Sequence, residues 1–425
     1  MTSTVPTLWR HPDFLRLWAA QAVSVLGSQI TELALPLAAI TVLGATPFQV
    51  GLLAATQYVP FLVIGLPAGA WVDRLPRRPV MVVADLVRFA ALLVVPLASL
   101  GGVLRLWMLY PTALVVGVMT VFFDLAAQSF LPTLIGEDQL VDGNTKLQMS
   151  STAGQLAGPG AGGLLVQWLT APVAVLANSI GFALSALLLL LLRGREAPSP
   201  PRAAGSRLTT EIREGLRSVL GHPLLRPIAL TAGLGNLFGL FGMGQAVLVL
   251  YGVRDLRLSP AVLGVVLAVA NAGILAGSLL NARLTRLRGV GPALAGSAAL
   301  MGPALLLLPL ATPGTAVPVL GLAMGLAGFS AAVFNVNQVS LRQSVTPAAM
   351  RGRMTATFRF VNWGAVPVGT FLGGALAGPL GLRNVLWLVG AGSLLSALPV
   401  LGRTVRSLRE IPAGPVHHDQ EVAHV

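Results

Sequence analysis

The sequence predicts an all-α polytopic membrane protein with twelve transmembrane helices arranged as two six-helix bundles. Of its 425 residues, 55% are hydrophobic and only 10% are charged, a composition too apolar for a water-soluble globule. Twelve apolar runs reach about 20 residues, the length that crosses the hydrocarbon core as a helix. Backbone groups in lipid must be bonded within their own segment, and these runs are too long and too uniformly apolar for barrel strands.

The apolar runs follow one another along the chain with short polar connections between them. We expect spans at residues 14–42, 48–72, 79–100, 106–131, 146–169, 172–192, 227–251, 259–281, 291–310, 315–340, 355–378 and 384–402. The first run is interpreted as a membrane span instead of a cleaved signal, because it is too long and no small-residue cleavage site follows it.

The distribution of basic residues predicts how the spans are oriented. With the N-terminus inside, the outer loops hold only Arg105, Arg254, Arg257 and Arg383 of the 28 Lys and Arg residues. Because positive loops stay on the cytoplasmic side, we expect a multi-pass protein of the cell (inner or plasma) membrane with both termini cytoplasmic. Contact with anionic lipid explains the net charge of +13, so no nucleic-acid partner is expected.

Two halves are predicted from internal similarity. The pair His11-Pro12 recurs as His222-Pro223 at an offset of 211 residues, and Thr46-Pro47 recurs as Ser259-Pro260 at an offset of 213. We therefore divide the chain into an N-terminal bundle (1–192), a cytoplasmic linker (193–226), a C-terminal bundle (227–410) and a polar tail (411–425). Transporters built from two such halves bind substrate between them, near the midplane.

Amide side chains inside the spans indicate which helices line that central cavity. Amides are costly in hydrocarbon, and eight of the predicted spans carry nearly all of them. The expected cavity residues are Gln29, Gln57, Gln128, Asn236, Gln245, Asn271, Asn335, Asn337, Gln338 and Asn362. The alternative for any single amide is a helix-to-helix hydrogen bond without a ligand.

The loop after the second span carries the motif that identifies a family. Residues 69–78 read Gly-Ala-Trp-Val-Asp-Arg-Leu-Pro-Arg-Arg. This resembles the major facilitator superfamily pattern Gly, three residues, Asp-Arg, one residue, Gly, Arg-Arg, with Pro76 in place of glycine. The resemblance covers residues 8 to 410 and implies a gate on the cytoplasmic side formed by Asp73, Arg74, Arg77 and Arg78.

A second motif lies in the fifth predicted span. Residues 154–163 match, at every fixed position, the Gly-x-x-x-Gly-Pro-x-x-Gly-Gly pattern typical of exporters in this superfamily, through Gly154, Gly158, Pro159, Gly162 and Gly163. Glycines permit close helix approach and the proline bends the helix, which could seal the cavity in one state. A merely close-packing helix is the alternative.

Two further segments indicate a subgroup within this superfamily. The opening residues 9 to 28 and Arg351-Gly352-Arg353 are similar to the subgroup that holds macrolide-type and siderophore exporters. The resemblance implies export of a small amphipathic molecule, such as a drug, an antibiotic or a siderophore-like compound, by a monomeric carrier using alternating access. Importers and lysophospholipid flippases of the same fold, or a non-transporting membrane sensor, remain alternatives.

Two carboxylates lie well inside the predicted spans, Glu32 and Asp124. An acid within the membrane indicates function, and either one could take a proton from one side and release it to the other. We interpret Glu32 as the coupling site of a proton antiporter, with contact to cationic substrate as the alternative. Asp124 is a second coupling candidate, but the family resemblance also allows it to pair with the arginines of the loop 69–78.

Catalysis is not expected. The five histidines, at positions 11, 222, 417, 418 and 424, all lie outside the predicted spans, and the chain has no cysteine. No nucleophile with a neighbouring base and no cluster of metal ligands is apparent in the sequence. We therefore predict a protein that is not an enzyme and needs no cofactor or metal.

Overall fold

The computed structural model describes residues 8–72, 74–136, 139–192, 216–347 and 350–410. Every regular element in those ranges is helical, as the composition predicts. The first bundle consists of α1 (Pro12–Leu37), α2 (Pro47–Val63), α3 (Gly65–Val72), α4 (Arg77–Leu100), α5 (Leu106–Leu134), α6 (Leu140–Leu169) and α7 (Ala171–Leu190). The second consists of α9 (Leu225–Phe238), α10 (Met243–Arg254), α11 (Pro260–Arg288), α12 (Val290–Leu306), α13 (Ala316–Val345), α14 (Arg351–Leu380), α15 (Leu382–Ser396) and the short α16 (Arg403–Arg406).

Ten helical segments in the described part of the chain are long and apolar enough to span a membrane. The two other predicted spans, 48–72 and 146–169, are helical but neither forms one continuous apolar helix. The span at 48–72 is interrupted at Ile64, which separates the 17-residue α2 from α3. The span at 146–169 lies within α6, whose first half is rich in polar residues. The all-helical membrane fold is confirmed, whereas the count of twelve spans stays a prediction.

The internal repeat predicted from the sequence has matching backbone devices in both bundles. The Nδ1 atom of His11 accepts a hydrogen bond from the Phe14 N–H at the start of α1 (3.1 Å). Its counterpart His222 accepts from the Leu224 and Leu225 N–H groups at the start of α9 (3.2 and 3.4 Å). Partial burial lowers the pKa of His222, which keeps the acceptor nitrogen unprotonated. The two histidines therefore cap equivalent helices.

Helix caps confirm the second offset as well. Thr46 and Ser259, 213 residues apart, each accept a hydrogen bond from the backbone N–H three residues later, at the starts of α2 and α11. The offset between equivalent residues of the two bundles is 211 before the break between α9 and α10 and 213 after it. Gly242 ends that break, and a Cβ there would lie 2.1 Å from the Asn236 carbonyl oxygen. The two extra residues are thus accommodated where the helix is interrupted.

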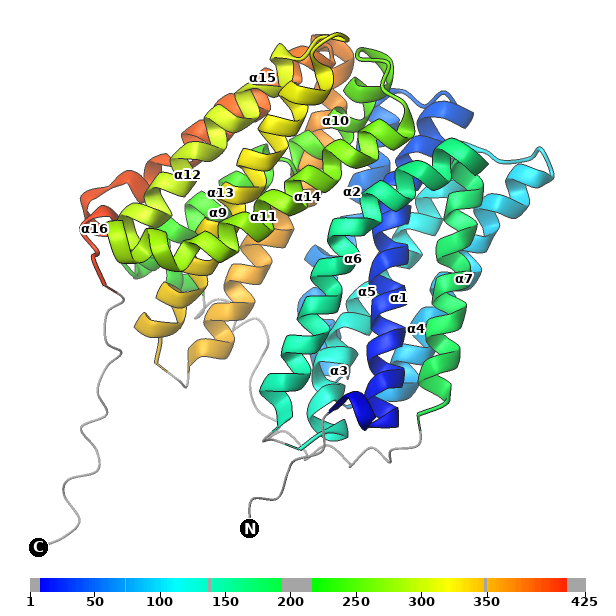
Figure 1. Cartoon of the computed structure of the whole chain (residues 1–425), viewed down its shortest axis with the longest axis horizontal. Coiled ribbons are helices and arrows are strands. Elements are labelled where there is room, and N and C mark those ends of the chain that lie inside the picture. Colours follow the sequence, from blue (N-terminus) through cyan, green and yellow to red (C-terminus); the bar gives the residue numbers. More distant parts are fainter. Residues whose placement is uncertain (1–7, 73, 137–138, 193–215, 348–349, 411–425) are drawn as a thin grey trace, which may run out of the picture.

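The two bundles lean together at one end and diverge toward the end where α3 and α16 lie (Figure 1). We call the latter, which carries Arg16, Arg74 and Arg226, the basic end, and the other the opposite end. Three contacts join the bundles at the opposite end. Arg254 donates to the Ala45 carbonyl (2.6 Å), the Ala261 N–H donates to the Gln167 side chain (3.2 Å), and the rings of Phe48 and Phe371 lie 5.7 Å apart.

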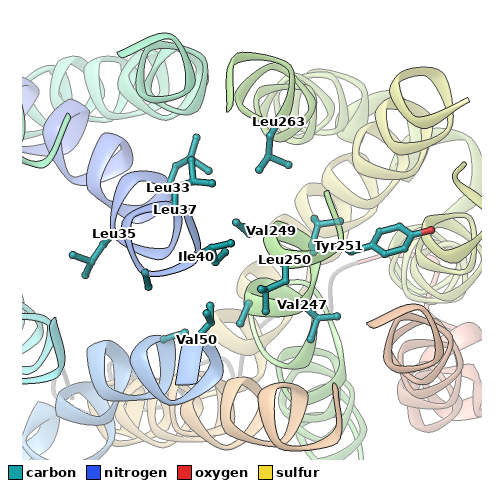
Figure 2. Close-up of a cluster of buried hydrophobic side chains, with 14 of the residues drawn as sticks. Leu33, Leu35, Leu37, Ile40, Val50, Val247, Val249, Leu250, Tyr251 and Leu263 are labelled. Carbon is teal, nitrogen blue, oxygen red and sulfur yellow. The ribbon is translucent and has the colours of Figure 1, made fainter. Parts of the chain in front are cut away.

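An apolar core at the opposite end contains side chains from both bundles. Ile40 and Val50 of the first bundle lie beside Leu250 and Leu263 of the second, and all four are buried (Figure 2). This shared core closes the opposite end. The bundles are therefore seen in a state that is shut at one end and opens at the other.

A buried ion pair organises the first bundle. Arg88 of α4 is 1% exposed, bonds to Asp85 one turn earlier, and lies between the rings of Phe123 (4.4 Å) and Phe182 (4.2 Å). From the sequence, Asp85 and Arg88 are expected to pair with each other or with the loop 69–78, and in the structure they pair with each other. The guanidinium thereby joins α4 to α5 and α7 through charge and through its contact with both aromatic faces.

Removing one member of this pair should leave an uncompensated charge inside the bundle. We predict that Asp85→Ala lowers the free energy of unfolding by about 3–5 kcal/mol. The double variant Asp85→Ala, Arg88→Met should lose less than the sum of the two single variants, because no lone charge remains. Equilibrium unfolding in detergent micelles measures both quantities, and strict additivity of the single effects would contradict this assignment.

Candidate functional site

Glu32 of α1 lies at the centre of a hydrogen-bond network that joins the two bundles. Its Oε1 accepts from the Tyr58 hydroxyl of α2 (2.9 Å) and from the Gln245 amide of α10 (3.2 Å). Its Oε2 accepts from the Gln29 amide (3.0 Å). The Gln245 amide also lies within hydrogen-bonding distance of the Tyr58 hydroxyl (3.1 Å). We call Glu32, Gln29, Tyr58 and Gln245 the central acid site.

Local sequence explains how the members of this site come together. Gln29 lies three residues before Glu32, so both side chains extend from the same face of α1. Gln245 follows Glu32 by 213 residues, the offset that relates Thr46 to Ser259. The acid and the amide are therefore equivalent positions of the two repeats, and they meet where the halves face each other.

An aromatic strip extends from the central acid site toward the basic end. Trp363 of α14 stacks on Phe61 (5.4 Å between ring centroids) and on Tyr58 (6.3 Å), both of α2. Tyr58 is 8% exposed, whereas Trp363 is 39% exposed. The strip again contains residues from both bundles, and its accessible end is suited to apolar or aromatic ligands.

Asp124 of α5 occupies a different place. The positive charges that act on it most strongly are those of Arg88 in its own bundle and Arg359 in the second bundle. The predicted partner loop is only partly described: Asp73 lies outside the described residues. Arg78 donates to the Leu189 and Leu190 carbonyls at the end of α7 (3.0 and 2.6 Å). Arg78 thereby holds the loop to the negative end of a helix dipole.

The glycine-rich motif of α6 makes two kinds of close contact. A Cβ at Gly154, Gly158 or Gly162 would lie 3.1, 2.3 and 3.2 Å, respectively, from atoms of α1, so these glycines pack α6 against its own bundle. Gly163 faces α11 instead, and a Cβ there would lie 2.4 Å from the Pro260 carbonyl oxygen. Gly264 of α11 packs in turn on the Pro159 carbonyl. The motif therefore also forms a crossing between the bundles at the opposite end.

Toward the basic end from this crossing, a pocket of about 720 Å³ opens between α6 and α11. Its α6 wall mixes polar and apolar side chains, and Leu275 of α11 lies across from it. The α6 residues are Asn144, Thr145, Gln148, Met149, Thr152, Ala153 and Leu156. The ten predicted cavity residues include none of this wall, although the span that carries it was expected to face the cavity and two of its residues, Asn144 and Gln148, are amides.

The remaining predicted cavity amides do not form one cluster. Asn236 donates to the Asn362 carbonyl (3.1 Å), Asn337 donates to Asn281 of α11 (2.7 Å), and Gln338 donates to Asn335 (2.9 Å). Gln57 is partly buried beside α5, and Gln128 is exposed. Asn337 is 3% exposed and bonds helix to helix, as the alternative interpretation states. Of the ten residues, Gln29 and Gln245 alone bond to Glu32 in the described network.

Sequence reasoning missed Tyr58, Phe61 and Trp363. Tyr58 is one of only three tyrosines, and its hydroxyl lies in an apolar run, which is a signal comparable to that of an amide. The aromatic rings gave no such signal, since they are ordinary residues within membrane spans. The described residues contain no group of three or more metal-ligating side chains.

Comparison with known proteins places these features in context. A family model described as Major Facilitator Superfamily matches residues 17–365. The multidrug efflux pump Tap of Mycolicibacterium fortuitum is 28% identical over 95% of this chain and 97% of its own. Macrolide efflux protein A of Streptococcus pyogenes is 21% identical (94% and 97%), and the enterobactin exporter EntS of Shigella boydii is 28% identical (87% and 86%). The resemblance to macrolide-type and siderophore exporters is thus confirmed.

Solved structures show the same fold. A bacterial homologue of the iron transporter ferroportin in its inward-facing state has a TM-score of 0.73 at 17% identity, over 92% of this chain and 98% of that one. The nucleoside transporter NupG (D323A mutant) has a TM-score of 0.74 at 14% identity, over 92% and 99%. For the outward-facing ferroportin homologue, over 92% and 98% at 16% identity, the TM-score is 0.57.

Enlarging the glycine that faces the second bundle should disrupt the crossing. We predict that Gly163→Leu separates the bundles at the opposite end, because the side chain has no room beside Pro260. Gly160→Leu is the matched control, since a Cβ at Gly160 meets nothing within 4 Å. A single cysteine at Phe48, introduced into this cysteine-free chain, should react faster with a membrane-impermeant maleimide in Gly163→Leu only. Equal rates in both variants would refute the crossing.

Proposed function

Because the chain belongs to the major facilitator superfamily, we propose that this transporter exports a small amphipathic molecule across the cell membrane in exchange for protons. The observation that carries the proposal is the Glu32 network, in which a membrane-embedded carboxylate bonds to residues of both bundles. Relatives named as multidrug, macrolide and enterobactin exporters support the direction and the substrate class: a drug, an antibiotic or a siderophore-like compound.

The orientation follows from charge. Positive loops remain in the cytoplasm, so the basic end is the cytoplasmic end and both termini are cytoplasmic. The bundles are then closed on the outside and open toward the cytoplasm. A carrier in this state takes up its substrate from inside the cell, as an exporter requires.

The proposed exchange of substrate for protons follows from the hydrogen bonds that Glu32 accepts. A charged carboxylate accepts hydrogen bonds about twice as strong as neutral ones, so ionised Glu32 binds the Gln245 amide firmly and resists separation of the bundles. A proton on Glu32, or a substrate that replaces Gln245 beside it, weakens this contact. The transporter with ionised Glu32 and no substrate therefore stays in one conformation. Only the transporter with protonated Glu32 or with bound substrate changes to the other conformation.

The substrate seat is proposed along the aromatic strip. Trp363 and Phe61 offer flat apolar surfaces next to Tyr58, whose hydroxyl bonds to Glu32, and Trp363 is 39% exposed. An amphipathic molecule can stack on the rings and direct a donor group toward Glu32. Each substrate would then compete with the proton for the same carboxylate.

The loop 73–78 is proposed as the gate at the cytoplasmic end. Arg78 donates to the Leu189 and Leu190 carbonyls at the end of α7. Asp73, Arg74 and Arg77 belong to the same segment of the sequence. When the bundles close at this end, an acidic partner such as Asp124 can meet the loop, and a coupling of about 1–3 kcal/mol is enough to bias the state.

Replacing the central acid tests proton coupling. We predict that Glu32→Gln reduces uphill efflux driven by an imposed pH gradient in proteoliposomes to the passive rate, because an amide cannot exchange a proton. Asp124→Asn, which removes a proposed gate partner instead of the proposed exchanging group, should lower the rate of efflux but keep its dependence on the gradient. Loss in Asp124→Asn with full activity in Glu32→Gln would reverse the two assignments, and wild-type flux that ignores the gradient would remove proton coupling.

Growth assays test export in cells. In a bacterial strain that lacks its main efflux pumps, the wild-type protein should raise the tolerated concentration of at least one amphipathic antibiotic. Glu32→Gln at equal membrane abundance should confer no protection. Greater sensitivity on expression of the wild type would indicate import, and an unchanged profile for all compounds would argue against drug export.

A further inference from the structure

The proline of the glycine-rich motif leaves one backbone carbonyl of α6 without its usual partner. In an α-helix, each N–H bonds to the carbonyl four residues earlier. Pro159 has no N–H and lies inside the continuous helix α6, so the Gln155 carbonyl lacks that bond. The same carbonyl lies near the middle of the 30-residue helix, where lipid and the neighbouring helices supply few donors.

A side chain from the other bundle takes the vacant position. The Nδ2 atom of Asn271, on α11, donates to the Gln155 carbonyl oxygen over 2.5 Å. We propose that Asn271 and Pro159 form a latch: the proline exposes the carbonyl, and the asparagine bonds to it only while the two bundles are closed at the opposite end. This inference deepens the proposed alternating access but depends neither on the direction of transport nor on protons.

The latch lies at the boundary between the closed and the open part of the α6–α11 contact. On its outer side, Gly264 packs on the Pro159 carbonyl and against Gly163. On its inner side, the pocket of about 720 Å³ begins, with Leu275 at its edge. Gly264, Asn271 and Leu275 are spaced seven and four residues apart, so they share one face of α11. Separating the glycine crossing therefore pulls Asn271 away from the carbonyl.

The proline makes this bond costly to lose. An ordinary helix carbonyl that loses a side-chain donor keeps its backbone hydrogen bond. The Gln155 carbonyl has no N–H four residues later to accept from, so loss of the Asn271 donor is more unfavourable for this partly buried acceptor than loss of a fully solvated hydrogen bond. The bond therefore favours the state that is closed at the opposite end, and Asn271 acts as a positioning residue for the change of state.

The equivalent crossing in the other half of the molecule lacks this device. Gly51 of α2 packs on Gly374 of α14, at offsets of 213 and 211 residues from Gly264 and Gly163. The counterpart of Asn271 is Tyr58, which bonds to Glu32 instead. The counterpart of Pro159 is Thr370, whose N–H can serve the carbonyl four residues earlier. One crossing thus carries the latch, and the other carries the acid-binding tyrosine.

Distances between spin labels test the latch without any substrate. The chain has no cysteine, so labels can be placed at Val103 and Leu310, exposed positions at the opposite end of each bundle. In lipid nanodiscs, Asn271→Ala should raise the ratio of separated to closed molecules about three- to tenfold, the effect of one hydrogen bond. Asn384→Ala is the control, because the Asn384 amide at the start of α15 bonds to the Leu380 carbonyl at the end of α14, within one bundle.

The decisive comparison uses Pro159→Ala, which restores an N–H for the Gln155 carbonyl. In that background, Asn271→Ala should change the ratio less than twofold. An equal effect of Asn271→Ala with and without the proline, or no effect in the wild-type background, would overturn the latch. If Asn271→Ala is not monodisperse, Asn271→Leu, which fills a similar volume without a donor, carries the same expectation. The label distances are measured without substrate and do not depend on whether the protein exports a drug in cells. Absence of export would therefore contradict the proposed function alone, and unchanged distances in Asn271→Ala would contradict the latch alone.

Discussion

A carboxylate within the membrane must be surrounded by donors, and this requirement determines how the centre of the molecule is built. Glu32 obtains two donors from its own bundle, Gln29 and Tyr58, and a third from Gln245 of the other bundle. Because Gln245 donates across the interface, the same hydrogen bond compensates the buried carboxylate and holds the two bundles together. The charge state of Glu32 and the relative position of the bundles are thereby linked.

The second requirement is close approach of the bundles at the opposite end. Glycines supply it at two crossings, Gly163 with Gly264 and Gly51 with Gly374. The shared apolar core around Ile40 and Leu250 lies beside them (Figure 2). The two crossings occupy equivalent positions of an internal repeat, but their polar neighbours differ. Beside one crossing Tyr58 bonds to Glu32, and beside the other Asn271 bonds to the Gln155 carbonyl.

Much of this arrangement could be predicted from the sequence. Hydropathy and run length are sufficient for a helical membrane fold, and the offsets of 211 and 213 residues reappear as matching caps at His11 and His222 and at Thr46 and Ser259. The importance of Glu32 also follows from the cost of an acid in lipid. These features depend on single residues or on local periodicity, which the sequence displays directly.

The remainder depends on contacts between distant helices. Ten amides were predicted to line one cavity, yet Asn337 bonds to Asn281 and Gln338 to Asn335, away from Glu32. Hydropathy cannot distinguish an amide that serves packing from one that serves a ligand. Tyr58 and Trp363 were missed for the same reason, since an aromatic ring in a span carries no mark of its neighbours. The bond from Asn271 to Gln155 joins residues 116 positions apart, and no local pattern contains it.

The link between the charge of Glu32 and the position of the bundles can be measured directly as the dependence of the Val103–Leu310 label distance on pH. If protonation of Glu32 releases the Gln245 contact, acidification should increase the population separated at the opposite end in the wild type. The same dependence should persist in Asp124→Asn and vanish in Glu32→Gln. A Glu32→Gln variant that retains the wild-type pH dependence would contradict the account.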